Sequence, residues 1–116
     1  MARALAAFEH EYRALPAGGF LEAASLFQLQ ALAHDVFRES DDEGRKLLAY
    51  VLRSVFRDLA QYLDGEPGVP PDAGFFSKTL AGPTEAAIAA LKRPLSGAKA
   101  ARLAIVLLDG RRSFLS

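Results

Sequence analysis

Hydrophobic residues recur at spacings of three and four along most of the chain, which is the repeat of an amphipathic α-helix. Glycine, proline and clusters of acidic residues interrupt this repeat and divide the first half of the chain into three helical segments. The segments expected to be helical cover residues 2–15, 20–38 and 41–63. Because the connections between them are short, neighbouring helices are expected to pack antiparallel.

The segment over residues 41–63 has the widest apolar face. Its apolar positions repeat at intervals of four and three residues: Leu48, Leu52, Val55, Leu59 and Tyr62. Further apolar rows flank this stripe, so the helix is expected to contact more than one neighbour and to lie at the centre of the fold. Ser40 and Glu43 match a capping box at its start, and Gly65 suits the left-handed position at its end.

The region that follows is less regular. Residues 65–74 contain three prolines and three glycines, which predicts a loop. Phe75 and Phe76 then lead into a short helical turn. Gly82 followed by Pro83 is expected to begin a further helix, because proline is tolerated in a first turn. One short and one longer helix are therefore predicted after the loop.

The C-terminal segment allows two interpretations. In the first, Ser96 caps a helix that continues through Leu108, with Gly110 just beyond its end. In the second, residues 102–115 form a β-hairpin whose turn is Asp109-Gly110. Several alanines favour the helix, and an isolated two-stranded hairpin is only marginally stable. The helix is therefore the preferred prediction.

These elements predict an all-α fold, a compact bundle of four to five helices with a proline- and glycine-rich loop near residues 65–74. The 116 residues correspond to a single domain, 1–116. The longest unbroken apolar run, residues 103–108, is far shorter than the roughly 20 residues that a membrane span needs. Because the chain has no cysteine and its first residues do not resemble a secretion signal, a cytoplasmic protein without a membrane span is expected.

The sequence contains no motif that is typical of catalysis or of binding a cofactor or metal. It lacks the Gly-x-Ser-x-Gly sequence of hydrolases and the glycine-rich loops that hold phosphate. Its two histidines, His10 and His34, are not spaced as in a helical metal site. No catalytic residue, cofactor or metal is therefore predicted, and the protein is not expected to be an enzyme.

The apolar run over residues 103–108 is the main functional signal. A helix that is apolar on every side must be enclosed, either by its own bundle or by another chain. Aromatic residues near this run add to the signal, because such residues concentrate binding energy at interfaces. The residues predicted to form a protein interface are Phe75, Phe76, Leu103, Val106, Leu107, Phe114 and Leu115. A homodimer is expected, since two-fold dimers are the commonest oligomers.

Charge is distributed unevenly, although the formal net charge is zero. Residues 1–85 hold 8 basic and 13 acidic groups, whereas residues 86–116 hold 6 basic groups and 1 acidic group. A basic C-terminal region is suited to an acidic partner or another anion. The residues predicted to provide this charge are Lys92, Arg93, Lys99, Arg102, Arg111 and Arg112.

Together these patterns predict a small non-enzymatic protein–protein interaction module, an adaptor, assembly factor or regulator that associates with another protein or with a second copy of itself. One alternative is a nucleic-acid-binding regulator that uses the basic region 92–112, although a balanced net charge does not favour it. A second alternative is a helical bundle that binds a small ligand through His34, Gln30 and Tyr50.

Overall fold

A computed structural model gives the fold and describes residues 2–16, 18–65 and 73–115. The elements are α1 (Ala2–Arg13), α2 (Ala23–Glu39), α3 (Glu43–Gly65), α4 (Ala73–Phe76), the π-helix η1 (Ser77–Ala81), α5 (Gly82–Leu91) and α6 (Gly97–Leu115). Every regular element within the described residues is helical, so the predicted all-α bundle is confirmed. The expected helices over residues 2–15 and 20–38 correspond to α1 and α2, with ends that differ by at most three residues.

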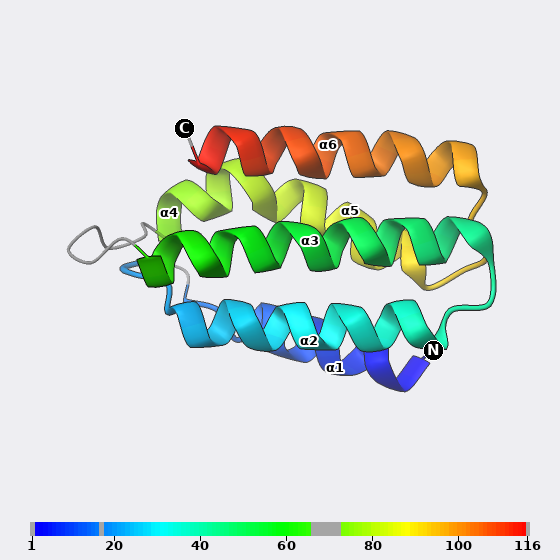
Figure 1. The fold of residues 1–116 in the computed structure, drawn as a ribbon, viewed down its shortest axis with the longest axis horizontal. Helices are drawn as coiled ribbons and strands as arrows, with labels where there is room; N and C mark the ends of the chain where they lie inside the picture. Colours follow the sequence, from blue (N-terminus) through cyan, green and yellow to red (C-terminus); the bar gives the residue numbers. More distant parts are fainter. Residues whose placement is uncertain (1, 17, 66–72, 116) are drawn as a thin grey trace.

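The helices form two layers (Figure 1). α2, α3 and α6 lie side by side in one layer, and α1 and α5 lie behind them in this view. α3 occupies the middle of the first layer and packs against α2, α6 and α5, as its wide apolar face predicts. α2 and α3 run antiparallel. α3 and α6 run in the same direction, because α4, η1 and α5 bring the chain back to the end at which α3 begins.

The core lies between the two layers. Phe8 of α1 meets Phe56 of α3 edge to face, with 5.8 Å between the ring centroids. On the other side, Phe56 approaches Phe76 of α4 at 6.2 Å. Four of the five residues in the predicted α3 stripe are fully buried: Leu48, Leu52, Val55 and Leu59. The fifth, Tyr62, lies at the surface and packs its ring against Phe114 of α6.

The C-terminal segment is one helix, so the alternative of a β-hairpin over residues 102–115 is wrong. α6 also continues through Gly110, which the sequence pattern placed just beyond the helix. A Cβ atom added at Gly110 would lie 2.6 Å from the carbonyl oxygen of Thr79. The glycine therefore allows the backbones of α6 and η1 to approach closely. This contact, and not a helix end, explains why residue 110 is a glycine.

The start of α3 also differs from the prediction. Its N-terminal cap is Asp42, because Asp42 Oδ2 accepts a hydrogen bond from the backbone N–H of Arg45 at 3.3 Å. Ser40, which the predicted capping box placed in this position, donates from its Oγ to the carbonyl oxygen of Val36 at 2.6 Å. The helix itself begins at Glu43, beyond the expected residue 41. The capping-box prediction is therefore wrong.

The chain passes from α4 through η1 to α5 without a break. The sequence predicted that a separate helix begins at Gly82, but at this residue the helix only changes from π-helix to α-helix. Gly82 has helical backbone angles, φ −58° and ψ −53°. Because Pro83 has no N–H, it cannot donate the usual helical hydrogen bond to the carbonyl of Thr79. The π-helix, which accommodates one extra residue in a helical turn, lies directly before this proline.

Two expectations from the sequence concern the periphery of the fold. The predicted loop near residues 65–74 falls largely on residues 66–72, which lie outside the described part of the chain. Among the described helices, none combines the length and the apolar character that crossing a lipid bilayer requires.

Candidate functional site

Three of the predicted interface residues lie in the core. Phe76, Leu107 and Phe114 are buried within the single chain. The rings of Phe76 and Phe114 meet edge to face at 6.3 Å, and this contact joins α4 to the C-terminal end of α6. These side chains hold α6 against the bundle, so the surface that remains open must be formed by other members of the apolar run.

The remaining members lie at the edge of the core or at the surface. Leu103 and Leu115 are half-buried against the core, and Val106 is 49% exposed. The side chain of Phe75 lies outside the described part of the structure. Ile105 is 59% exposed but was not among the predicted interface residues. Helix phase identifies it, because it projects from the side of α6 that faces away from the core.

α3 and α6 lie alongside each other with a constant offset in sequence. At one end, Asp42 Oδ2 accepts a hydrogen bond from the backbone N–H of Leu95 at 2.9 Å. Near the other end, Arg111 Nη1 bonds Asp58 Oδ2 at 2.7 Å. Both pairs are separated by 53 residues. A residue of α6 therefore lies at about the same level as the α3 residue whose number is smaller by this offset.

This register brings apolar residues of the two helices together on one side of the layer. We call this surface the α3–α6 face, and its apolar residues are Leu47, Val51, Ala101, Ile105 and Leu108. Their spacings of three and four residues place them on one stripe of each helix. Leu47 and Ile105 are among the exposed large hydrophobic residues. The α3–α6 face is therefore an apolar strip that the single chain leaves partly open.

The two ends of the α3–α6 face carry different charges. Asp41 and Glu43, at the start of α3, are exposed and have no ion-pair partner among the described residues. At the opposite end, Arg112 Nη2 bonds Asp109 Oδ1 at 2.7 Å, and both side chains are largely exposed. Arg111 lies beside this pair. The apolar strip thus runs from an acidic end to an end that is rich in arginine.

A second surface lies between α5 and α6, on a different side of α6. This α5–α6 groove has a volume of about 840 Å³. It is lined by Ala86, Ala89, Ala90, Lys92, Arg93, Pro94, Leu95, Ser96, Lys99 and Leu103. Its floor is formed by small and apolar side chains, and its rim is basic. None of these lining residues is acidic.

The six predicted basic residues form two groups in the structure. Lys92, Arg111 and Arg112 are paired within the chain, and Lys92 Nζ lies 3.1 Å from Glu9 Oε1. The other three residues form no ion pair within the described part of the chain: Arg93, Lys99 and Arg102. All three lie near the turn between α5 and α6, so the unpaired members of the predicted basic set gather at or beside the α5–α6 groove.

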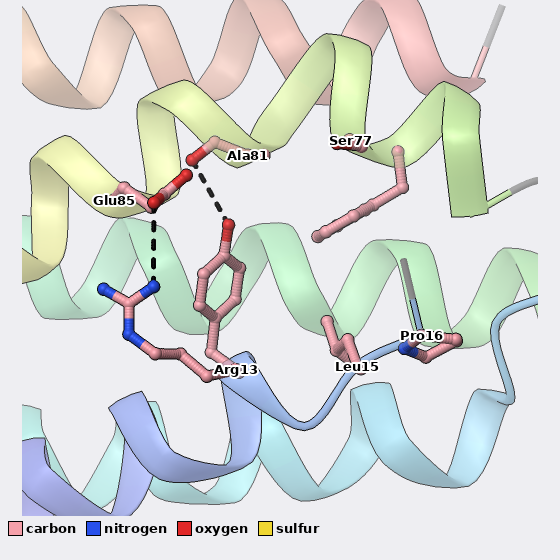
Figure 2. A pocket seen from close by; sticks show the side chains of 8 residues that line it. Arg13, Leu15, Pro16, Ser77, Ala81 and Glu85 are labelled. Atoms are coloured by element: carbon pink, nitrogen blue, oxygen red, sulfur yellow. Dashed lines mark hydrogen bonds and ion pairs between the residues drawn. The ribbon is translucent and has the colours of Figure 1, made fainter. Parts of the chain in front are cut away.

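A smaller pocket of about 210 Å³ lies where the end of α1 meets η1 and α5 (Figure 2). Tyr12 donates its hydroxyl hydrogen to the carbonyl oxygen of Ala81 at 3.3 Å. Arg13 Nη1 lies 3.7 Å from Glu85 Oε1 on the opposite wall. Burial, followed by the nearby charge of Glu85, raises the pKa of Tyr12 to about 12. Tyr12 therefore stays protonated and serves as a donor that ties α1 to the π-helix.

The residues of the predicted small-ligand site form a cluster at the surface between α2 and α3. His34 Nδ1 lies 3.1 Å from Arg53 Nη1, and the His34 ring stacks on Phe37 at 6.2 Å. Tyr50 packs against Phe37 and beneath the Arg53 guanidinium, while Gln30 lies on α2 one turn before His34. The side chains are thus engaged with one another, and Tyr50 is exposed.

Comparisons with protein-family models, curated protein sequences and solved structures find no match to this chain. In the described part of the structure, no group of three or more histidine, cysteine, aspartate or glutamate side chains is placed to hold a metal ion. Function is therefore inferred from the geometry and charge of the α3–α6 face and the α5–α6 groove.

Proposed function

We propose that the protein is a small non-enzymatic interaction module that forms a symmetric dimer through its α3–α6 face and acts in the cytoplasm as an adaptor, assembly factor or regulator. The observation that carries this proposal is the exposure of Ile105. This side chain lies in the middle of an apolar strip shared by two packed helices, yet it is 59% exposed in the single chain. Covering the strip with a second copy removes this apolar surface from water, which is favourable.

The distribution of charge supports a two-fold arrangement. In a symmetric interface, the same surface of both copies is used, and a two-fold axis perpendicular to the strip places each end of it against the opposite end of the partner. The offset of 53 residues places Ile105 at the level of Leu52, next to Val51. Glu43 lies eight residues before Val51, and Arg112 lies seven residues after Ile105. A two-fold axis at this level and perpendicular to the helices therefore brings the acidic end of one copy, which holds Glu43, to the arginine-rich end of the other, which holds Arg112.

The dimensions of the molecule are compatible with an interface of ordinary size on this side. The principal extents of the Cα trace are 41 × 25 × 22 Å, and the α3–α6 face belongs to the broad side of the layer. A typical specific interface buries about 800 Å² on each partner. The strip combines an apolar centre with charged ends, which is the usual arrangement of an interface with a hydrophobic core and a polar rim.

Analytical ultracentrifugation of the wild type and two matched variants tests the proposal. We expect a dimer at protein concentrations between about 1 and about 100 µM, which correspond to moderate affinity. Ile105→Lys places a charge at the centre of the apolar strip and should give a monomer with unchanged helical content. Val106→Lys introduces the same charge on the groove side of α6 and should leave the dimer intact. A monomeric wild type, or equal dissociation by both variants, would contradict the proposal.

A charge-reversal series tests the two-fold pairing itself. Glu43→Arg and Arg112→Glu each place like charges opposite each other and should weaken the dimer by about tenfold. The double variant exchanges the two charges and should recover most of the lost affinity. If the double variant is weaker than both single variants, Glu43 and Arg112 do not face each other, and the proposed axis is wrong.

A further inference from the structure

We infer that the α5–α6 groove binds an amphipathic helix of a partner protein whose apolar stripe is flanked by acidic residues. This inference goes beyond the proposed dimer, because the groove and the α3–α6 face lie on different sides of α6. Two observations carry it. The floor of the groove consists of small and apolar side chains, and its rim holds positive charge that the described residues do not neutralise.

The floor suits a helix. Ala86, Ala89 and Ala90 lie on one stripe of α5, and Leu103 faces them from α6. Alanine side chains extend little beyond the backbone, so a third helix can approach α5 closely, and interaxial distances depend on the side chains at the contact. Val106, half-exposed one turn beyond Leu103, extends the apolar surface along α6. Along α6 the surface from Lys99 to Val106 spans about two helical turns, the length that i, i+3, i+4 and i+7 anchors occupy.

The rim selects acidic residues. Arg93 stands in the turn between α5 and α6, Lys99 stands in the first turn of α6, and Arg102 follows Lys99 by three residues on the same side of α6. With no acidic residue lining the groove, these cations repel one another in the free protein. Glutamate or aspartate residues on a bound helix relieve this repulsion and also fix the direction in which the helix lies.

The apolar floor favours a peptide over a nucleic acid. Phosphate backbones are held mainly by cations, and dedicated binders carry a clear positive excess. This chain has a formal net charge of zero, and Lys92, Arg111 and Arg112 are already paired within it. Three cations around an alanine floor are better matched to a helix that offers both apolar and acidic side chains.

Fluorescence anisotropy with labelled model peptides tests the inference. The probe is a helical peptide of about 18 residues, or five turns, with alanine and leucine on one stripe and glutamate on both flanks. The comparison peptide replaces every glutamate with lysine, and a single-stranded DNA of matched length is the third probe. We expect the glutamate peptide to bind at least about tenfold more tightly than the lysine peptide, with an affinity that falls as salt is raised.

Charge-reversal variants locate the binding. Arg93→Glu combined with Lys99→Glu should weaken binding of the glutamate peptide by at least about tenfold. Arg38→Glu combined with Lys78→Glu removes the same charge from exposed positions elsewhere and should change binding by less than about twofold. Ala89→Trp fills the floor at an exposed position and should also abolish binding, without a change in the thermal unfolding temperature.

Several results would overturn the inference. These are equal affinity for the glutamate and lysine peptides, tighter binding of DNA that depends on Arg93 and Lys99, or no peptide binding at protein concentrations up to about 200 µM. Loss of the dimer in the Arg93→Glu, Lys99→Glu variant would also overturn it, since the groove would then be filled by a second copy. The outcome is separable from the proposed dimer, because Ile105→Lys should dissociate the dimer and leave peptide binding intact.

Discussion

α3 and α6 are the two longest helices, they run side by side in the same direction, and both carry more apolar residues than one stripe holds. α3 has neighbours on both sides of its layer and behind it, so its widest apolar face is enclosed. α6 lies at the edge of the layer, and Ile105 and Val106 stay exposed on two sides of it. The position of a helix in the layer therefore decides, as much as its hydrophobicity, which apolar residues stay available to partners.

The largest expected difference between the two helices concerns truncation of apolar side chains. Leu52→Ala in α3 removes a fully buried side chain and should lower the free energy of unfolding by about 3 kcal/mol. Ile105→Ala in α6 should change it by less than about 0.5 kcal/mol in the monomer, because the side chain is already largely in water. Urea unfolding measures both changes, at a protein concentration too low for the dimer to form. A cost above about 1 kcal/mol for Ile105→Ala would show that α6 is enclosed as α3 is.

The second prediction concerns the contact that sets the register of the two helices. A Cβ atom added at Gly44 of α3 would lie 1.9 Å from the carbonyl oxygen of Leu95, just before α6. Gly44→Ala should therefore lower the free energy of unfolding by about 2 kcal/mol or more, as forced overpacking does. Gly97→Ala is the control, because a Cβ there meets no atom within 4 Å. It should be neutral or stabilise the protein by up to about 1 kcal/mol.

The third prediction uses pH to test the same end of the two helices. Although partial burial opposes it, hydrogen bonds from the side chain of Arg45 and from the backbone N–H of Leu95 and Arg45 lower the pKa of Asp42 from 3.8 to about 2. A lowered carboxyl pKa gives stability that is present above pH 3.8 and is lost as the pH falls toward about 2.

Asp42→Asn should therefore lower the free energy of unfolding by about 1 kcal/mol at pH 7, the usual value of a helix cap, with part of the capping bond retained. The difference between wild type and variant should shrink between pH 4 and pH 2, measured by urea unfolding at each pH. A difference that stays constant over this range would show that the charge of Asp42 does not stabilise the junction of α3 and the turn before α6.

The smallest expected effect concerns the ion pair near the other end of the two helices. Arg111→Met removes the partly buried pair with Asp58 and should cost about 0.5 to 1 kcal/mol, less at high salt. Arg112→Met removes an exposed pair with Asp109 and should cost less than about 0.3 kcal/mol. Equal effects of the two changes would mean that the contact between α3 and α6 gains nothing from Arg111.

The candidate surfaces could be predicted from the sequence only in part. The apolar run and the basic C-terminal region are visible in the pattern, and both contribute residues to the surfaces described above. Leu107, which is buried, and Ile105, which is exposed, belong to one unbroken apolar run, and helix phase separates them only once the side of α6 that faces the core is known. The pattern could not separate Arg93 from Arg111, because the partner of Arg111 is an aspartate 53 residues away.

The sequence by itself determined the all-α class, the central position of α3 and the approximate extents of α1, α2 and α3, because these depend on local spacing, on proline and glycine, and on the width of an apolar stripe. Tertiary structure alone decided why Gly110 is a glycine, which residue caps α3, and which cations keep their charge free. Each of these depends on atoms that the fold brings together from distant parts of the chain or on the final position of a helix end. Spacing along one segment carries no information about such contacts.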